Sequence, residues 1–466
     1  MRNLVALASL GTLAFTLTAC RPEATRSPGS GPTSADPNPS REVPTASAQA
    51  KAEFGRAVQA YASARADGKV TDDECDAVAA EFTRVYKAHG AAMAIAEFNA
   101  GVVREECGQP DRAEAIYAGL VAAVPKFDLA YNNLGVLYWK KGQEEKALDL
   151  FKRGVEANKL SARAARNNVA GLLRDKYVDK GDVKLFDEAQ TTIQGVLALD
   201  SSNKAAYENL ARIYYDRGHR KDKSYLVLAN LVVTQGMRVL ANEDKKSADL
   251  HNIQGLLLLE RDDQVSALKT FKSAVEIEPN HTEANLNIGF ISIRFRDYAT
   301  AETAFKTALK SPTEQKNLEL WLALGVAQRG LKKYKDAETS YNQAVKLNAG
   351  DPRAFFNLGV LYQDHIAVQV DDLDEVSKLG AVARKYYVKF GEAAGKADAY
   401  KVRVLESQDR IATLEQNDIL LAQTKALEKE VARLKVEAEK AEAIERERLA
   451  KLEKEAMAAE GAAPAP

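Results

Sequence analysis

The chain contains few of the side chains that usually carry catalysis or metal binding. Its 466 residues include three cysteines, five histidines and two tryptophans. No HExxH motif, no Cys/His cluster with zinc spacing and no GxSxG motif occurs. We therefore expect no enzyme, no catalytic residue, no metal and no cofactor. The histidines are scattered, at His89, His219, His251, His281 and His365.

The chain also lacks an excess of charge of either sign. It has 65 basic and 66 acidic residues, so the formal net charge is -1. A nucleic-acid-binding protein usually carries a basic patch or stripe. We therefore expect no nucleic acid and no small-molecule substrate, and we expect proteins as the partners. At 46% hydrophobic residues the chain has ample material for a core.

Two short segments look like binding loops but fit poorly. When Gly68 is aligned with the invariant glycine of an EF-hand loop, Arg65 falls where an acidic calcium ligand is needed. Residues 391–396 resemble a phosphate-binding loop, but they are one residue short and follow a predicted helix instead of a strand. We interpret the first segment as a plain helix–turn–helix, with Thr71 and Glu74 forming a capping box.

The chain begins with a short basic start followed by an apolar run at 4–17, which is too short to span a bilayer as a mature helix. This is the plan of a secretory signal peptide, assigned to residues 1–19. After it, no apolar run is long enough for a transmembrane helix. The sequence Leu-Thr-Ala-Cys at 17–20 resembles the lipobox of bacterial lipoproteins. The resemblance implies cleavage before Cys20 and lipid, such as palmitate, on that residue.

Residue 21 bears on the destination of such a lipoprotein. By resemblance to lipoprotein sorting rules, Arg21 in place of Asp implies the outer membrane, with the body facing the periplasm and the acyl chains as its only membrane contact. Plain secretion and an uncleaved anchor remain the alternatives. Residues 20–48 are rich in Pro, Ser, Thr, Ala and Gly and indicate a disordered tether. A second disordered tail is expected at 459–466.

A pattern of about 34 residues recurs through most of the chain. One copy reads Tyr131, Leu134, Gly135, Tyr138, Gly142, Ala147 and Phe151. This spacing resembles the tetratricopeptide repeat (TPR), a unit of two helices. Copies begin near residues 94, 128, 162, 204, 248, 282, 318 and 352. The steps after 162 and 204 are longer, and we expect the extra residues, around 175–185 and 219–224, to lengthen the connections between helices.

The resemblance implies an all-α fold, a TPR solenoid in which helical hairpins stack into a right-handed superhelix. We place an N-terminal helical cap at 49–93 and the solenoid at 94–395, with an atypical terminal cap after Asp372. This assignment concerns the fold and is silent about function.

Residues 396–458 predict a long charged helix. A heptad pattern of core residues runs through Leu420, Thr424, Leu427, Val431, Leu434 and Ala438. The pattern weakens afterwards, because Glu445 and Arg448 fall at core positions. Both a partner-binding coiled coil and a lone solvated helix fit this composition.

The two remaining cysteines have a symmetric placement. Cys75 and Cys107 each lie sixteen residues from Ala91, at the turn between two predicted helices. If these helices pack antiparallel, residues equidistant from the turn lie side by side. In an oxidising compartment we therefore predict a Cys75–Cys107 disulfide. Two independent buried thiols are the alternative.

Asparagine recurs at the sixth position of the repeats. The residues are Asn133, Asn167, Asn209, Asn287 and Asn357, and the series is interrupted at Ile253 and Ala323. This resembles the asparagine ladder of superhelical TPR proteins, which implies a groove that holds the backbone of an extended peptide. A purely local role for asparagine at this position is the alternative. Trp139 is either an exposed anchor of the same groove or a buried core residue.

The order of lipid anchor, tether, TPR solenoid and long charged helix resembles the adventurous gliding-motility TPR lipoproteins of the myxobacterial envelope machinery. The resemblance implies a scaffold that binds protein partners of an envelope complex through the TPR groove and the C-terminal helix. A pilotin-like or outer-membrane assembly factor is the alternative, although such proteins are typically shorter and lack a long C-terminal helix.

Overall fold

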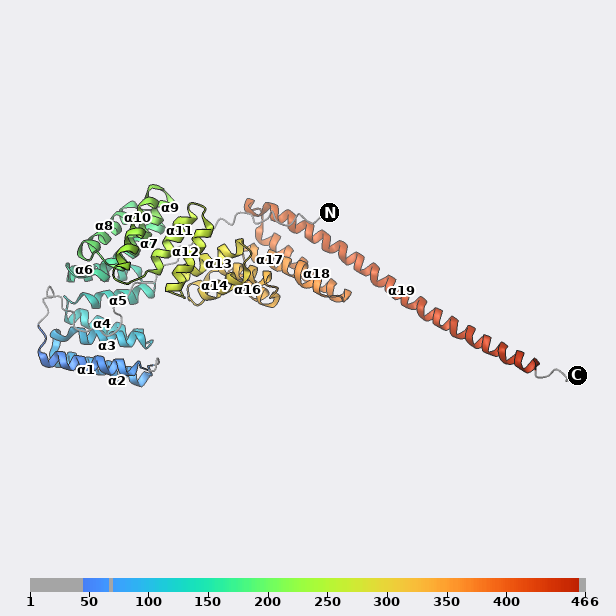
Figure 1. Ribbon diagram of the computed structural model, residues 1–466, viewed down its shortest axis with the longest axis horizontal. Helices are drawn as coiled ribbons and strands as arrows, with labels where there is room; N and C mark the ends of the chain where they lie inside the picture. The colour runs from blue at the N-terminus through green and yellow to red at the C-terminus, as the bar shows by residue number, and fades with distance from the viewer. Residues whose placement is uncertain (1–44, 67–69, 461–466) are drawn as a thin grey trace. The chain divides into compact units, whose positions relative to one another are not determined.

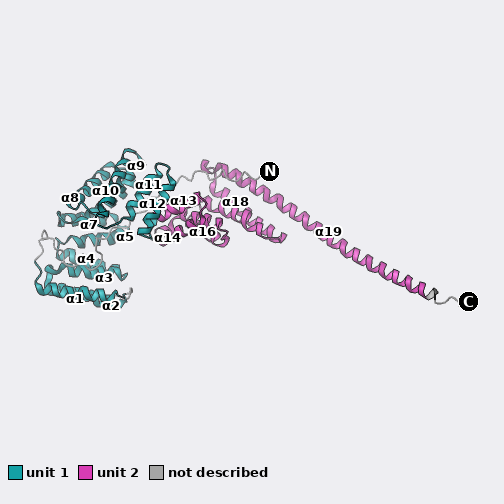
Figure 2. Cartoon of the chain, viewed as in Figure 1, with its two compact units in different colours: residues 1–283 teal, residues 284–466 magenta. Residues whose placement is uncertain are grey.

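The protein is described by a computed structural model that covers residues 45–66 and 70–460. The leader, Cys20 and Arg21, most of the predicted tether, the EF-hand-like turn at 67–69 and the tail at 461–466 lie outside the described residues. Within the described ranges every regular element is a helix (Figure 1). The chain divides into two compact units, residues 1–283 and 284–466 (Figure 2).

Unit 1 is a series of helical hairpins in which each helix packs on the next one along the chain. Its helices are α1 (Ala48–Ala64), α2 (Asp72–His89), α3 (Ala94–Glu106), α4 (Pro110–Ala123), α5 (Asp128–Lys140), α6 (Glu144–Ala157), α7 (Arg163–Lys180), α8 (Val183–Leu199), α9 (Lys204–Arg220), α10 (Ser224–Ala241), α11 (Ala248–Leu259) and α12 (Gln264–Ile277). Thr71 and Glu74 form the predicted capping box at the start of α2.

Unit 2 begins within α13 (Thr282–Arg294) and continues the hairpins to a terminal pair. Its other helices are α14 (Tyr298–Ala308), α15 (Leu318–Gly330), α16 (Tyr334–Leu347), α17 (Pro352–Leu361), α18 (Leu373–Ala394) and α19 (Lys401–Glu460). The predicted all-α solenoid of hairpins with a long C-terminal helix is confirmed. The first helix of each hairpin starts within one residue of the start read from the repeat.

A glycine on the first helix and an aromatic residue on the second hold most hairpins together. A Cβ added to Gly135 would lie 2.6 Å from a ring carbon of Phe151, closer than real Cβ contacts come. The ring of Phe151 is fully buried. The same contact joins Gly101 with Tyr117, Gly255 with Phe271, Gly289 with Phe305, Gly325 with Tyr341 and Gly359 with Tyr387. Only a residue without a side chain lets the helices approach this closely.

The two long repeats correct one expectation. Their extra residues lengthen the helices and not the connections, because α7 to α10 have 17 or 18 residues each, against 13 and 14 in α5 and α6. Helix α7 continues to Lys180 and ends at Gly181, whose φ of 70° is left-handed. Asp182 then caps α8 with its side chain, so the connection is only two residues long.

The end of the solenoid is atypical, as its sequence indicates. After α17 the chain makes a π turn at Tyr362–Ile366, and α18 has 22 residues. Helix α19 starts at Lys401, because Gly395 ends α18 and Asp398–Tyr400 forms a short 3-10 turn. The first part of α19 packs on α18, so the long helix is not isolated along its whole length.

Helix α10 corrects the expectation that no membrane-length apolar run follows the leader. By length and composition it could cross a membrane, and it is the one helix of the described residues for which this holds. It packs against α9 with Ala229, Val233 and Gly236 buried. Its other side exposes Val227 and Leu231 at 69% and 63%. The helix carries apolar residues on both faces, and this accounts for its high hydropathy.

Candidate functional site

The first helices of successive hairpins in unit 1 contact one another directly. Helix α5 contacts α7, α7 contacts α9, and α9 contacts α11. The second helices contact their own hairpin partner and the first helix of the next hairpin. The first helices therefore form one continuous layer, and we call its surface the first-helix face. Side chains that cross it can join several repeats into one binding surface.

A group of charged side chains crosses the first-helix face. Arg212 on α9 binds Glu283, the last residue of unit 1, with 2.8 Å between Nη1 and Oε1. These two residues are 71 positions apart, so the pair reaches past an entire hairpin. Arg174 on α7 donates to Asp216 on α9 at 2.5 Å. We call the set the charged cluster: Arg174, Glu208, Arg212, Asp216, Asp249, His281 and Glu283.

The middle of the charged cluster holds two carboxylates that disfavour each other's charge. Burial, and after it the neighbouring charge of Asp249, raises the pKa of Glu208 to about 7. Burial alone would also raise the pKa of Asp249, but the hydrogen bond from His281 lowers it overall. The side chain of Asp249 remains 49% exposed. Lys204 already lies 3.6 Å from Glu208, and His281 lies 3.3 Å from Asp249. A further cation at this position would favour the charged form of both carboxylates.

The other charged residues of the cluster are neutralised by partners of opposite charge within the protein. Burial opposes the charge on Glu283, but the guanidinium of Arg212 lowers the pKa of Glu283 overall. The Arg174 side chain is 5% exposed and its partner Asp216 is 11% exposed. Removing one partner of such a pair would leave a buried charge, which costs several kcal/mol, about 3–5. These pairs hold the face in shape around Glu208 and Asp249.

The predicted asparagine positions all fall on first helices, yet their amides are used inside the protein. Asn209 donates to the backbone carbonyl of Asn167 at 3.2 Å, and Asn167 donates to the Asn203 side chain at 3.1 Å. Asn133 donates to the Tyr117 hydroxyl at 3.3 Å.

This corrects the expectation that the amides are offered to a bound peptide. Asn133, Asn167 and Asn287 are buried, with 3–6% exposed. Asn357 is only partly buried, but its amide donates to the carbonyl oxygen of Arg353 on its own helix. The physical reason is that a backbone carbonyl of the neighbouring helix lies within reach of the amide, as at Asn209.

Two further asparagines that the sequence reasoning missed complete an internal chain of hydrogen bonds. Asn168 on α7 donates to Asn132 on α5 at 2.8 Å, and Asn132 donates to Asn133 at 3.1 Å. Asn133 continues the chain to Tyr117. In the sequence, the paired asparagines at 132–133 and 167–168 are the feature from which Asn132 and Asn168 could have been predicted. Because these groups are buried and bonded across repeats, they fix the register of adjacent hairpins.

Trp139 is a core residue and not an exposed anchor. It is 7% exposed, and its ring lies edge-on to Phe151 with 6.1 Å between centroids. Its outer ring atoms also approach Gly171 on α7. The indole therefore fills the space between two hairpins, which is why it does not reach solvent.

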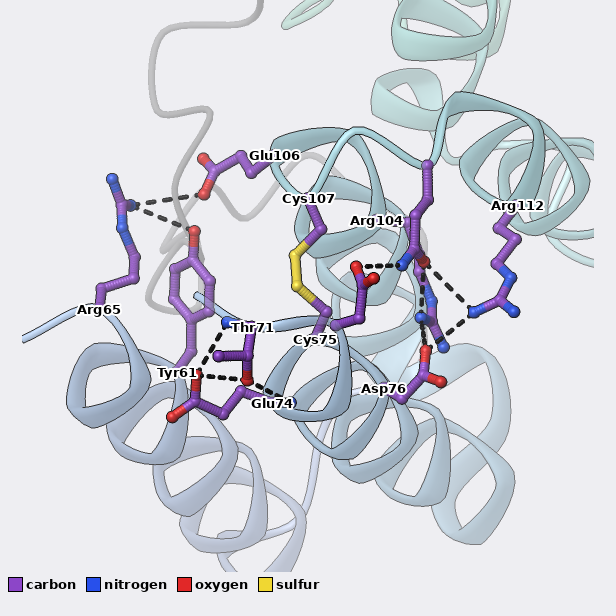
Figure 3. The surroundings of a disulfide bond; sticks show 12 residues. Tyr61, Arg65, Thr71, Glu74, Cys75, Asp76, Arg104, Glu106, Cys107 and Arg112 are labelled. Atoms are coloured by element: carbon purple, nitrogen blue, oxygen red, sulfur yellow. Dashed lines mark hydrogen bonds and ion pairs between the residues drawn. A yellow bond between two sulfur atoms is a disulfide. The ribbon is translucent and has the colours of Figure 1, made fainter. Parts of the chain in front are cut away.

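The structure joins Cys75 and Cys107 in a disulfide between α2 and the end of α3 (Figure 3). Their Cα atoms are 6.4 Å apart, and Cys75 is fully buried. Beside the bridge, Asp76 on α2 pairs with Arg104 on α3 and with Arg112 on α4. These contacts tie the N-terminal cap to the first hairpin of the repeat array.

Nothing in the part of the chain that the structure describes suggests a metal centre. In residues 45–66 and 70–460, no group of three or more His, Cys, Asp or Glu side chains is arranged to hold an ion. His281 and His219 bind carboxylates instead, on Asp249 and Glu260.

Comparison with known proteins identifies the repeat. Residues 98–165, 293–352 and 322–362 match the tetratricopeptide repeat family model. The chain contains tetratricopeptide repeats. The hairpins within these ranges are thus TPR units, and the described fold is a TPR solenoid.

The relatives of this TPR protein are distant. It is 24% identical to the BBSome complex member BBS4 of Bos taurus, over 51% of this chain and 42% of that protein. It is 23% identical to the protein O-mannosyl-transferase TMTC3 of Homo sapiens, over 47% of this chain and 24% of that protein. The chain thus spans less than half the length of these curated relatives. A solved TPR protein of Thermus thermophilus has 20% identity and a TM-score of 0.36, over 43% of this chain and 99% of that one.

The disulfide should stabilise the protein by constraining its unfolded state. The bridge spans 32 residues, and closing a loop of this size contributes roughly 3–4 kcal/mol. Replacing both Cys75 and Cys107 with serine should lower the free energy of unfolding by about this amount in urea titrations. A Cys20→Ser variant is the control, since it leaves the bridge intact. Peptide mass mapping of the full-length protein, purified without reductant, should find the bridge; two free thiols would contradict it.

The stability of the TPR solenoid should fall as pH rises from about 4.5 to about 7. The folded-state pKa of Glu208, about 7, lies above its ordinary value of 4.5, so folding takes up a proton between these values and the stabilisation is lost once pH has passed the folded pKa. Burial would lower the pKa of His281, but the hydrogen bond with Asp249 raises it overall, which gives the same sign. The lowered pKa of Asp249 acts only at more acidic pH.

The measurement is the melting temperature of the full-length chain across this range. Glu208→Gln cannot ionise and should flatten the decline, whereas Glu188→Gln on α8, whose side chain is 46% exposed, should leave it unchanged. An equal decline in the wild type and Glu208→Gln would show that Glu208 does not titrate as described.

Proposed function

We propose that the protein is a lipid-anchored TPR scaffold that binds protein partners in a complex of the bacterial outer membrane. The observation that carries the binding role is the charged cluster, which spans successive repeats and keeps the half-exposed Asp249 beside the buried Glu208. TPR folds commonly bind other proteins, and stacked repeats provide an extended surface for this. The lipid anchor and the location rest on the Leu-Thr-Ala-Cys sequence at 17–20 and on Arg21.

The chemistry of the cluster indicates what kind of partner segment it takes. Two adjacent carboxylates that resist being charged together are stabilised by a cation. A lysine or arginine side chain of a partner would add to the positive charge that Lys204 and His281 already place there, and the ion pairs around it would keep the site preorganised. We therefore propose that an extended segment with a basic side chain lies along the first-helix face. The role is binding and not catalysis.

Within the outer membrane, the proposed setting is a gliding-motility complex. The order of anchor, tether, solenoid and long helix supports this setting, and the 60 residues of α19 would extend about 90 Å. Such a length suits a scaffold that contacts parts of an assembly at different distances from the membrane.

Anchoring is tested by two substitutions beside the cleavage site. Cys20→Ser should abolish labelling with palmitate and release the protein from membranes. Arg21→Asp should keep the lipid but move the protein to the inner membrane, as read by density fractionation. Membrane association that persists in Cys20→Ser without palmitate would contradict the lipid anchor. Deletion should abolish surface movement and leave outer-membrane insertion of other proteins normal; missing secretins or porins would indicate the assembly role instead.

Partner binding is tested by neutralising charges on one face only. The double variant Glu208→Gln with Asp249→Asn should reduce partner capture at least roughly tenfold. The matched control is Glu188→Gln with Glu276→Gln, which removes the same charge from the second helices α8 and α12. Both variants should keep the helical circular dichroism of the wild type. Equal capture by the two variants, measured by affinity purification and mass spectrometry, would exclude the first-helix face as the binding site.

A further inference from the structure

Helix α19 carries about half of the large apolar side chains that the described residues leave exposed. They are Val402, Leu405, Ile419, Leu420, Leu427, Val431, Leu434, Val436, Ile444, Leu449, Leu452 and Met457, each 49–79% exposed. The middle of this set follows the heptad pattern, in which Leu420, Leu427 and Leu434 recur every seven residues. Solvated helices rarely place leucines this regularly, so the stripe calls for a partner.

The heptad stripe does not face α18. The contacts of α19 with α18 come from other residues: Asp418 accepts from Ser377 and Arg384, and Lys425 pairs with Asp374. Leu414, on the same side of α19, is buried. At 3.6 residues per turn, the direction of these contacts and the heptad stripe are separated by roughly 130° around the helix axis. The intramolecular packing of α19 therefore leaves the stripe accessible.

The residue types on the stripe select a two-stranded parallel coiled coil. Leucine occupies every d position from Leu420 to Leu434, and the a positions carry the β-branched Thr424 and Val431. One heptad earlier the a position is Asn417, which is exposed. Leucine at d with β-branched residues at a favours dimers, and a single asparagine at a fixes their register.

The shape and charge of the stripe fit a second copy of the same helix. A shallow hollow on α19 is lined by Thr424, Leu427, Glu428, Val431, Ala432 and Lys435. These are a, d and flanking positions, where a side chain of a facing helix inserts. In a parallel pair in register, Glu430 at g lies near Lys435 at e of the other copy, and symmetry forms this attraction twice.

The charges at the g and e positions also indicate where the coiled coil ends. Glu437 would meet Glu442 of the other copy and repel it, and the core positions after Ala438 become Ala441, Glu445 and Arg448. We propose that residues 417–438 of α19 pair with the same residues of a second copy as a parallel coiled coil. This inference does not rest on the proposed function. A common membrane anchor would favour the pairing by raising the local concentration of the two copies.

The test uses the full-length chain carrying Cys20→Ser, in which the other two cysteines are bridged. Light scattering should give twice the monomer mass at high protein concentration. Leu427→Lys should halve that mass. Val436→Lys is the matched control, because Val436 is also exposed but lies at f, away from the stripe; this variant should stay dimeric. A wild-type monomer at all concentrations, or equal masses for the two variants, would overturn the proposal.

Whether the two helices run parallel is tested by single cysteines at two d positions. In a parallel pair, both Leu420→Cys and Leu434→Cys should crosslink to dimers under mild oxidation, since each residue faces its own copy. An antiparallel pair brings at most one of these positions face to face. Crosslinking of only one variant, or of neither, would overturn the parallel arrangement. Circular dichroism of each variant should match the wild type, which separates lost pairing from lost helix.

Discussion

The close contact between a glycine and an aromatic ring, present in six of the repeat hairpins, is the interaction on which most of the solenoid depends. At Gly135 the missing side chain lets the ring of Phe151 lie directly on the backbone of α5. This sets the distance between the two helices, and the distance sets where the next hairpin packs. Repetition of the contact gives six hairpins of one kind. The two long hairpins, α7–α8 and α9–α10, lack it, because Gly171 meets Trp139 of the preceding hairpin and Gly218 meets Leu226.

A second set of interactions joins the hairpins across the first-helix face. The amides of Asn168 and Asn209 bind groups of the preceding hairpin, and Arg212 reaches Glu283 beyond the following one. Solenoids are commonly stabilised by nearest-neighbour contacts alone. Here a partly buried ion pair spans a longer interval, so this part of unit 1 should open as a larger cooperative unit than a single repeat.

The fold could be predicted because its signals are local and repeated. The glycine and aromatic positions recur at one spacing, and the start of each hairpin follows from them to within a residue. The placement of Cys75 and Cys107 about a turn is also a local signal, and the structure brings the two residues together. The positions of Asn133 and Trp139 in the repeat did not show whether their side chains are buried or exposed, because each lies on a helix that has both a buried and an exposed side. The charged cluster was not visible in the sequence, since its pairs are 32, 42 and 71 residues apart and follow no period.

The disulfide between α2 and α3 has a consequence for when the N-terminal cap becomes stable. A cysteine pair stays reduced in the cytosol and oxidises after export. Without the bridge, the N-terminal cap relies on the packing of residues such as Phe54 and Phe82. If the chain is exported, as proposed, its passage through an export channel requires an unfolded chain. A bridge that forms only after export would then leave the precursor free to unfold and would stabilise the cap at its destination.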